Sequence, residues 1–197
     1  MAVQVARLLA FHYGRTQQRI LHVAEELDDD QLRRTWPKAN SIAFDVWHCA
    51  RWADHLQSIL PDMTPALLAR LGRREELWTR DGLARRWSFP TALGHVETGM
   101  GMDESLAAAL PLPQKGPLLD YVRAAFALSA AAVDRLEDGD LMNDAAIEDA
   151  RAPWLSGSAD KGPVANWVLS YDEHANRHLG MVELRRGLLG MRGTATA

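Results

Sequence analysis

The sequence predicts an all-α protein: a four-helix bundle of up-down-down-up type, with long crossover connections and short extra helices. Three observations predict this fold. Alanine and leucine are abundant while runs of β-branched residues are absent, apolar residues recur at three- and four-residue steps in four long segments, and alternation with period two never extends beyond a few residues. A chain of 197 residues is long enough for one well-buried core, so we expect a single domain over residues 1–197.

The first helix is expected over residues 2–27 and to end at the acidic run Asp28–Asp30. Its stripe consists of Val5, Leu9, His12, Thr16, Ile20, Val23 and Leu27. The second helix is expected over residues 41–60. Asn40 or Ser41 is its predicted N-cap, because either side chain can accept from the free N–H groups of the first turn.

Residues 61–116 are rich in glycine and proline and predict a long crossover with short helices at about 64–71 and 102–110. A connection of this length in a compact domain is usually functional or covers a site. The third long helix is expected over residues 117–136, beginning with a proline, which is favoured in a first turn.

The last helix is expected over residues 163–189, after a polar, loop-rich stretch at 137–162. One face carries Val164, Trp167, Val168, Tyr171, His174, Ala175, His178, Val182 and Leu189. The opposite face carries Asn166, Glu173, Asn176, Arg177 and Glu183 and is expected to meet solvent.

His174 and His178 lie inside this apolar stripe, four residues apart. Residues at this spacing stack on one helix face with Cβ atoms about 5–6 Å apart, which lets two imidazoles reach one ion at Zn–N distances of about 2.0–2.1 Å. Two buried histidines side by side would otherwise need separate hydrogen-bond partners and would disfavour each other's protonation. The spacing favours a site for one divalent metal ion, with two separately bonded histidines as the alternative.

A third ligand must come from another helix, and His48 is the best candidate because it lies near the middle of the second helix. On an ideal helical wheel it falls on the flank of the apolar seam, beside Trp52 and His55. The alternative is a core histidine that bonds a backbone carbonyl. Cys49 is expected to be buried and inert on the inner seam, and Asp54 is expected to cap a helix or to pair at the surface.

Other side chains are candidates for supporting roles. His12, His55 and Asp45 can supply an acid, a base or a partner for a metal ligand. Trp52 is a candidate for contact with a substrate, and Arg80 for binding an anionic one, although solvated arginines are the commoner case.

Composition limits the possible partners. The net charge is −4 and no cluster of lysine and arginine stands out, so no nucleic-acid surface is expected. No apolar run approaches the roughly 18 residues of a membrane-spanning helix, and the N-terminus lacks the features of a signal peptide. A single cysteine fits a reducing compartment, so we expect a cytoplasmic protein.

Two segments carry a resemblance to a known family. Asn40–Asp54 (NSIAFDVWHCARWAD) resembles the second-helix signature of the DinB/YfiT-like superfamily. Asp172–Gly180 (DEHANRHLG) resembles its last-helix motif, H-x-x-x-H followed by a small residue, and Leu184–Gly187 is similar to its usual L-R-G ending. The likeness spans most of the chain, and the two histidine motifs are its specific part.

The resemblance implies a four-helix bundle in which three histidines, here His48, His174 and His178, hold one divalent metal ion, often zinc or nickel, and it implies a homodimer. Characterised members of the superfamily include mycothiol-dependent maleylpyruvate isomerase and bacillithiol-linked transferases. We therefore expect a metal-dependent thiol transferase or isomerase that acts on a small molecule and uses a low-molecular-weight thiol such as mycothiol or bacillithiol. The alternative is a non-catalytic, stress-linked or binding protein with a structural or vestigial metal.

The donor set bears on this choice. Three neutral imidazoles leave a fourth position open, as in catalytic zinc sites, and such an ion can lower the pKa of bound water to about 7 or hold a thiol as thiolate. A protease-type H-E-x-x-H motif is absent, because Ala175 follows His174. A catalytic site predicts a solvent-connected pocket, whereas a structural site predicts a sealed one or a fourth protein ligand.

Overall fold

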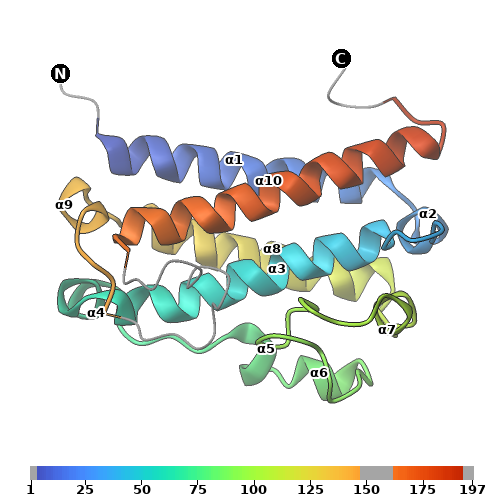
Figure 1. The fold of residues 1–197 in the computed structure, drawn as a ribbon, viewed down its shortest axis with the longest axis horizontal. Helices are drawn as coiled ribbons and strands as arrows, with labels where there is room; N and C mark the ends of the chain where they lie inside the picture. The colour runs from blue at the N-terminus through green and yellow to red at the C-terminus, as the bar shows by residue number, and fades with distance from the viewer. Residues whose placement is uncertain (1–3, 147–161, 193–197) are drawn as a thin grey trace.

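The computed structural model describes residues 4–146 and 162–192. Within these ranges the chain is all-α, with isolated β-bridges as the only strand-like pairs. Four long helices make up the bundle: α1 (Val5–Glu26), α3 (Ile42–Ile59), α8 (Lys115–Val133) and α10 (Val164–Leu188). α1 and α10 run in one direction and α3 and α8 in the opposite direction (Figure 1). The predicted up-down-down-up bundle is therefore confirmed.

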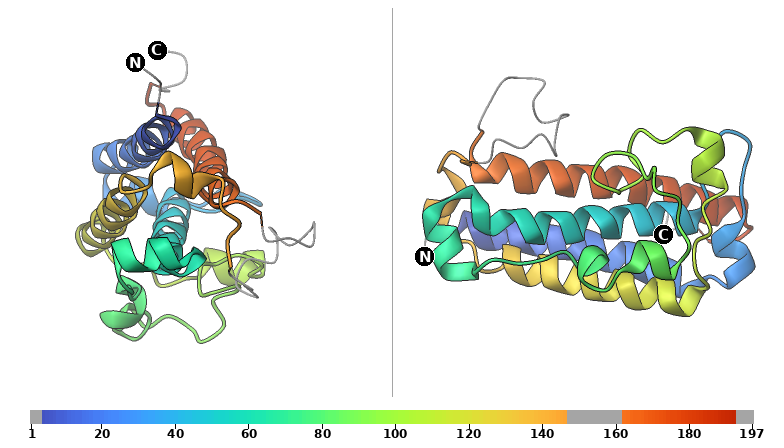
Figure 2. Two further views of the ribbon diagram at one scale, coloured as in Figure 1. Left: turned by 90° about the vertical axis from the view of Figure 1, so that its left-hand side faces the viewer. Right: turned by 90° about the horizontal axis from the view of Figure 1, so that it is seen from below.

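Each long helix packs against two others. α3 lies between α8 and α10, and α1 contacts both of these from the other side, as the left view of Figure 2 shows nearly end-on. Polar contacts help to set the register of α1. Asn176 Nδ2 donates to Thr16 Oγ1 at 3.0 Å, and the Tyr13 hydroxyl is hydrogen-bonded to Ser129 on α8.

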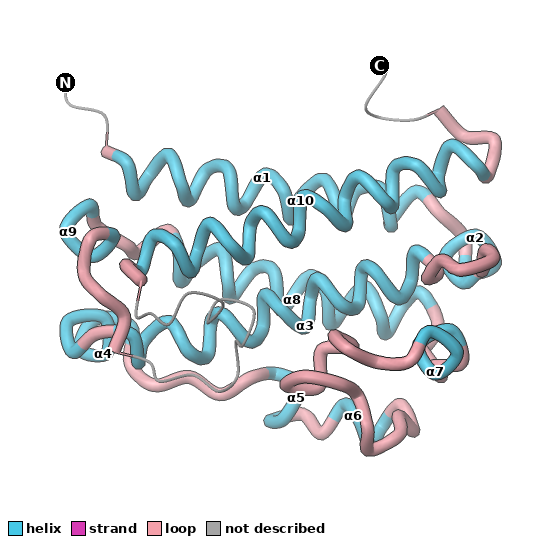
Figure 3. Tube along the Cα trace, in the orientation of Figure 1, coloured by secondary structure: helices cyan, strands magenta, loops and turns pink. Residues whose placement is uncertain are grey.

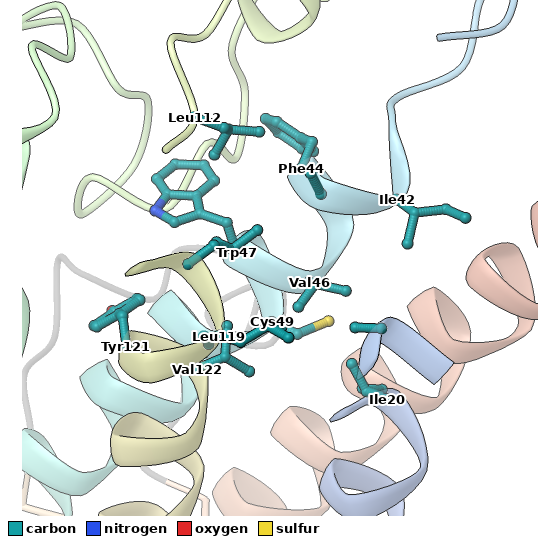
Figure 4. Close-up of a cluster of buried hydrophobic side chains, with 14 of the residues drawn as sticks. Ile20, Ile42, Phe44, Val46, Trp47, Cys49, Leu112, Leu119, Tyr121 and Val122 are labelled. Carbon is teal, nitrogen blue, oxygen red and sulfur yellow. The ribbon is translucent and has the colours of Figure 1, made fainter. Parts of the chain in front are cut away.

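α3 is the central helix of the molecule, with every side chain from Ile42 to Gln57 buried. α8 and α10 cover part of its surface and the crossover covers another part. Figure 4 shows Trp47 of α3 among Leu112 of the crossover and Leu119 of α8. A helix covered in this way must also find partners for its polar side chains. On α3 these are Asp45, His48, Arg51, Asp54, His55 and Gln57.

The start of α3 agrees with the prediction, since Ser41 Oγ accepts from the Phe44 N–H at 3.1 Å. The acidic run before it does more than end the first helix. Asp28 caps a further short helix, α2 (Asp29–Arg33), in a capping box with Gln31. Two reciprocal hydrogen bonds, of 2.8 Å and 3.0 Å, form this box.

The crossover contains both predicted short helices and three that were not predicted, one of them a 3₁₀-helix. After α3 come the 3₁₀-helix η1 (Leu60–Met63) and α4 (Pro65–Leu71), and α7 (Glu104–Ala108) precedes α8. The additional single turns are α5 (Leu77–Arg80) and α6 (Leu83–Arg86). Figure 3 shows the remainder of the crossover as loop that runs alongside α3.

The prediction that Asp54 lies at the surface is wrong. Asp54 is fully buried, because it accepts from the backbone N–H groups of Leu77 and Trp78, each at 2.9 Å. The carboxylate therefore caps α5 from across the α3–crossover interface. Asp54 is a capping residue, which was one of the two expectations. The helix that it caps is distant from it in sequence.

Three further side chains lie differently from the predicted stripes. Val5, at the start of α1, is exposed. His12 is exposed, because the buried face of α1 includes Tyr13 and Gln17 in its place. Glu183, expected to meet solvent, is buried and pairs with Arg19 of α1 at 2.7 Å. Glu183 can be buried on the polar face of α10 because its charge is paired with an arginine of the neighbouring helix.

The polar stretch between α8 and α10 begins with another short helix, α9 (Asp138–Leu141). The rest of the predicted loop, residues 147–161, lies outside the described residues, as does Trp154. Among the helices of the described ranges, none is long and apolar enough to cross a membrane.

Candidate metal centre

The structure brings together the three histidines that the sequence singled out. One ring nitrogen from each of His48, His174 and His178 lies within 4.8 Å of the others. His48 Nε2 is 3.1 Å from His174 Nε2, and the three ring centroids are 4.6 to 4.9 Å apart. α3 and α10 run antiparallel, which places the middle of α3 beside the histidine pair. Within the described residues, this is the one group of three His, Cys, Asp or Glu side chains with such geometry.

Two of the rings are held by acceptors at Nδ1. His48 Nδ1 is 2.5 Å from the carbonyl oxygen of Thr98, and His178 Nδ1 is 3.1 Å from Asp45 Oδ1. A carbonyl and a carboxylate only accept hydrogen bonds, so both rings carry their proton on Nδ1. Each of these two rings therefore carries its lone pair on Nε2, and this is the arrangement in which imidazole binds a metal ion.

The residues present fit a divalent ion. Two nitrogens that each lie about 2.0–2.1 Å from a tetrahedral ion are about 3.4 Å apart, which is close to the observed 3.1 Å between His48 Nε2 and His174 Nε2. His174 Nδ1 is buried and makes no hydrogen bond within the described structure. His48 Nε2 and His174 Nε2 are within hydrogen-bond distance, so without an ion His174 can share one proton with His48, whereas an ion would satisfy the lone pairs of all three rings.

The surroundings keep His48 and His174 neutral. Burial, followed by the neighbouring His178, lowers the pKa of His48 to about 4. Burial, followed by His48 and His178, lowers the pKa of His174 to about 2. A metal ion binds the neutral imidazole, so at neutral pH these two ligands need lose no proton to bind.

The triad opens onto a cavity of about 600 Å³, which is within the usual range for small-molecule sites. Its apolar wall consists of Phe44, Met100, Met102, Ala107 and Met181. Its polar lining, apart from the triad, includes Asn40, Glu104, Ser170, Glu173 and Arg177. Several of these residues come from the crossover, and sequence reasoning missed them because no helical periodicity connects them to the histidines.

The loop that carries Thr98 is tightly constrained. Gly99 has φ +90°, and a Cβ atom there would lie 2.8 Å from Trp47 and 2.9 Å from Phe44. Val96 and Glu97 also have positive φ angles, which are rare for a β-branched residue. The carbonyls of Val96 and Glu97 accept from Arg51, each at 3.0 Å. The loop thus presents three successive carbonyls, of residues 96–98, to α3.

The other candidate residues lie in different places. Asp45 contacts the triad through His178. His55 is buried two turns further along α3, where its Nδ1 pairs with Glu76 Oε1 at 2.7 Å. Trp52 lies between the triad and His55, with its ring centroid 5.8 Å from those of both His174 and His55. It packs against the triad but is not among the side chains that line the cavity.

His12, Arg80 and Cys49 are not part of the triad. His12 is exposed on α1. Arg80 pairs with its neighbour Asp81 at 2.7 Å and lines a separate cavity of about 370 Å³. Cys49 is buried, as expected, with its sulfur directed toward Ile20 of α1 (Figure 4), and burial raises the pKa of its thiol. It therefore has the character of an inert core residue.

Comparisons with known proteins identify the family of the chain and a protein of similar fold. Residues 12–182 match the family model of the DinB superfamily. The fold is similar to that of a conserved protein from Enterococcus faecalis, with a TM-score of 0.69 and 20% sequence identity over 96% of this chain and 99% of that one. No curated protein matches the sequence.

Proposed function

The chain belongs to the DinB superfamily, and on this premise we propose that His48, His174 and His178 bind one divalent metal ion that serves chemistry on a small molecule. The superfamily is typically metal-binding, and the triad could hold such an ion. Zinc or nickel is the proposed ion, because neutral imidazole is a suitable ligand for both. The observation that carries the proposal is the position of the triad at the wall of an open cavity.

The proposed reaction class is transfer or isomerisation with a low-molecular-weight thiol, of the mycothiol or bacillithiol type. A divalent ion with three imidazole ligands and an open position favours the thiolate form of a thiol that reaches it. The chain's own residues would prepare this site. Thr98 and Asp45 fix the orientation of two of the rings, and the apolar wall with Phe44 and Met181 limits the access of water.

The polar lining suggests how a substrate would be oriented. Glu173 and Arg177 lie on the face of α10 beside the histidines and pair with each other at 3.0 Å. Both side chains are largely exposed, so this pair costs little to separate. Arg177 is therefore available to a carboxylate on the substrate or thiol, and Asn40 offers both a donor and an acceptor.

The alternative is a non-catalytic protein with a structural metal. That function calls for a sealed site or a fourth protein ligand. The triad instead borders a cavity, and the ligand group found among the described residues has three members. The open site favours the catalytic proposal.

The proposal can be tested in two steps. Protein purified without a histidine tag is expected to contain about one divalent ion per chain by elemental analysis. Calorimetry on the metal-loaded protein is then expected to detect binding of mycothiol, bacillithiol or glutathione, with loss of binding in the metal-free protein. Metal-loaded protein that binds none of the three thiols would contradict the thiol-dependent function and favour the structural alternative.

A homodimer is proposed as well. Large apolar side chains are exposed on α1 and α10, among them Leu8, Phe11, Leu184 and Leu188, and exposed apolar patches often mark protein contacts. Light scattering coupled to gel filtration is expected to give twice the chain mass. A monomer at micromolar concentration would contradict this part of the proposal.

A further inference from the structure

Arg185 lies two turns beyond His178 on α10, and its side chain is almost completely buried. Its Nη1 donates to Asp45 Oδ2, while Asp45 Oδ1 accepts from His178 Nδ1 at 3.1 Å. The two oxygens of one carboxylate are thus divided between an arginine and a histidine of the triad. From this arrangement we infer that Arg185 is a positioning residue of the metal centre, acting on His178 through Asp45. The inference rests on the proposed metal site.

The helix geometry explains why these groups meet. His178 and Arg185 are seven residues apart and so lie on one face of α10. Asp45 and His48 are three residues apart and share a face of α3. Because the two helices run antiparallel, Asp45 lies opposite the interval between His178 and Arg185, and His48 lies opposite His174 and His178. The carboxylate is therefore approached by its two donors from opposite sides.

The burial of Asp45 makes the arginine necessary to this geometry. Asp45 has no exposed surface, and a buried carboxylate requires a countercharge and hydrogen bonds to both oxygens. Arg185 supplies the charge and holds Oδ2, which leaves Oδ1 directed at His178. Without Arg185 the carboxylate would keep one of these two donors, His178. The Asp45 side chain would then lose the hydrogen bond that holds the rotamer in which Oδ1 faces the His178 ring.

Arg186 offers a matched control, because it is the next residue on the same helix and is also largely buried. Its ion pair is with Glu26 of α1, a helix that contributes no triad histidine. Removing either arginine breaks one partly buried ion pair between α10 and another long helix. Only Arg185 has a partner that touches a triad histidine among the described residues.

The test compares Arg185→Met, Arg186→Met and Arg185→Lys with the wild-type protein. Zinc dissociation constants are measured at pH 7.5 by competition with a chromophoric chelator. Because changes to groups that support metal ligands typically cost 10- to 100-fold in affinity, Arg185→Met is expected to bind zinc about 10- to 100-fold more weakly. Arg186→Met is expected to stay within about threefold of wild type, and Arg185→Lys to lie between the two.

A second readout does not depend on metal. Long-range ¹H–¹⁵N spectra of the metal-free protein report which ring nitrogen of His178 is protonated. The wild type and Arg186→Met are expected to show His178 protonated at Nδ1, and Arg185→Met to show a mixture of the two tautomers. A purely structural role for Arg185 would lower the melting temperature without changing this spectrum.

The outcomes separate the two proposals. Wild-type protein that binds no zinc would contradict the proposed function, while the His178 tautomer would still test the role of Arg185. Wild-type zinc affinity and an unchanged His178 spectrum in Arg185→Met would overturn the inference. If Arg185→Met does not fold, Arg185→Gln, which also removes the charge, takes its place, and the same two results in folded Arg185→Gln would overturn the inference.

Discussion

Helix α3 carries two buried polar clusters that differ in how completely they are satisfied. The first consists of Asp45 and His48 and faces α10. The second consists of Arg51, Asp54 and His55 and faces the crossover. The α3 side chains of both clusters are buried. The first cluster leads to the triad nitrogens beside the cavity, whereas the second pairs opposite charges with one another.

The second cluster is largely satisfied from within the protein. Arg51 donates to Glu76 Oε2 at 2.8 Å, to Asp54 Oδ2 at 3.3 Å and to Tyr121 at 3.3 Å, besides the two loop carbonyls. Burial works against ionisation of Glu76, but the hydrogen bond from His55 and the charge of Arg51 outweigh it and lower its pKa to about 2. One cation thus joins two carboxylates and the crossover to α3.

The comparison shows how a polar cluster that stabilises the fold differs from one that forms a binding site. Buried charges that complete one another's hydrogen bonds hold a segment in place, and here they hold the crossover. Ring nitrogens of three histidines that converge beside a cavity can instead be satisfied by an ion from outside the chain. The two clusters are also connected, because the loop that Arg51 holds carries the Thr98 carbonyl that orients His48.

The largest expected effect separates the clusters by metal content. His174→Ala removes one of three ligands and is expected to reduce bound metal from about one ion per chain to almost none, since three protein ligands are the usual minimum for such a site. His55→Asn keeps a donor for Glu76 and is expected to retain the ion. Elemental analysis after dialysis measures both. Equal metal contents in the two variants would break the distinction between the clusters.

The next effect concerns stability and should come mainly from the second cluster. Arg51→Met leaves two buried carboxylates without their cation, and breaking a buried pair in this way costs about 3–5 kcal/mol. Urea unfolding of the metal-free protein measures the loss. Arg80→Met is the control, because Arg80 is exposed and pairs with its neighbour Asp81, and little change in stability is expected. A loss below about 1 kcal/mol for Arg51→Met would show that the network does not hold the crossover.

The two clusters should also lose stability in different pH ranges. The pKa of His48 is lowered from 6.5 to about 4 in the folded protein, so the unfolded chain binds more protons between these values. The free energy of unfolding of metal-free protein is therefore expected to fall as the pH falls from 6.5 to 4. The pKa of Glu76 is lowered from 4.5 to about 2, so its contribution is lost at lower pH, between 4.5 and 2.

Unfolding experiments across this pH range measure both windows. His48→Gln is expected to reduce the dependence between pH 6.5 and 4 without removing it, because His174, whose pKa is lowered to about 2, contributes over the same range. If His48→Gln instead kept the full dependence between pH 6.5 and 4, His48 would not contribute to the upper window.

The smallest effect tests the connection between the clusters. Gly99→Ala combines a positive φ angle with contacts of 2.8 Å and 2.9 Å to Trp47 and Phe44, so the loop must shift, at a cost of about 1–3 kcal/mol. Gly101 has a φ angle of +76° and open space at its Cβ position, which makes Gly101→Ala the matched control for backbone strain. Zinc affinity is expected to weaken several-fold in Gly99→Ala and less in Gly101→Ala. Equal affinities would indicate that the position of Thr98 does not govern His48.

Local patterns predicted much of the fold and part of the site. The four long helices and the two crossover helices followed from periodicity and from glycine and proline. His174 and His178 followed from their spacing, because residues four apart on a helix meet whatever the tertiary structure is. His48 depended mainly on the family resemblance, since its position on the flank of a helix does not say which neighbour it faces.

The remaining features depend on partners distant in sequence. Asp54 looked like a surface residue because nothing near it reveals the N–H groups of Leu77 and Trp78. Glu183 looked solvent-facing because Arg19, its partner, lies on another helix. The Thr98 carbonyl has no signature at all, because every residue has one. Such pairings are set by the packing of segments and cannot be read from a single helix.

The most direct test of the central claim is a crystal structure of the zinc-loaded protein with anomalous diffraction measured at the zinc edge. We expect one anomalous peak about 2.0–2.1 Å from Nε2 of His48, His174 and His178, with the remaining coordination position directed into the cavity beside Phe44 and Met181. A peak elsewhere, or a fourth protein ligand that closes the site, would contradict the account.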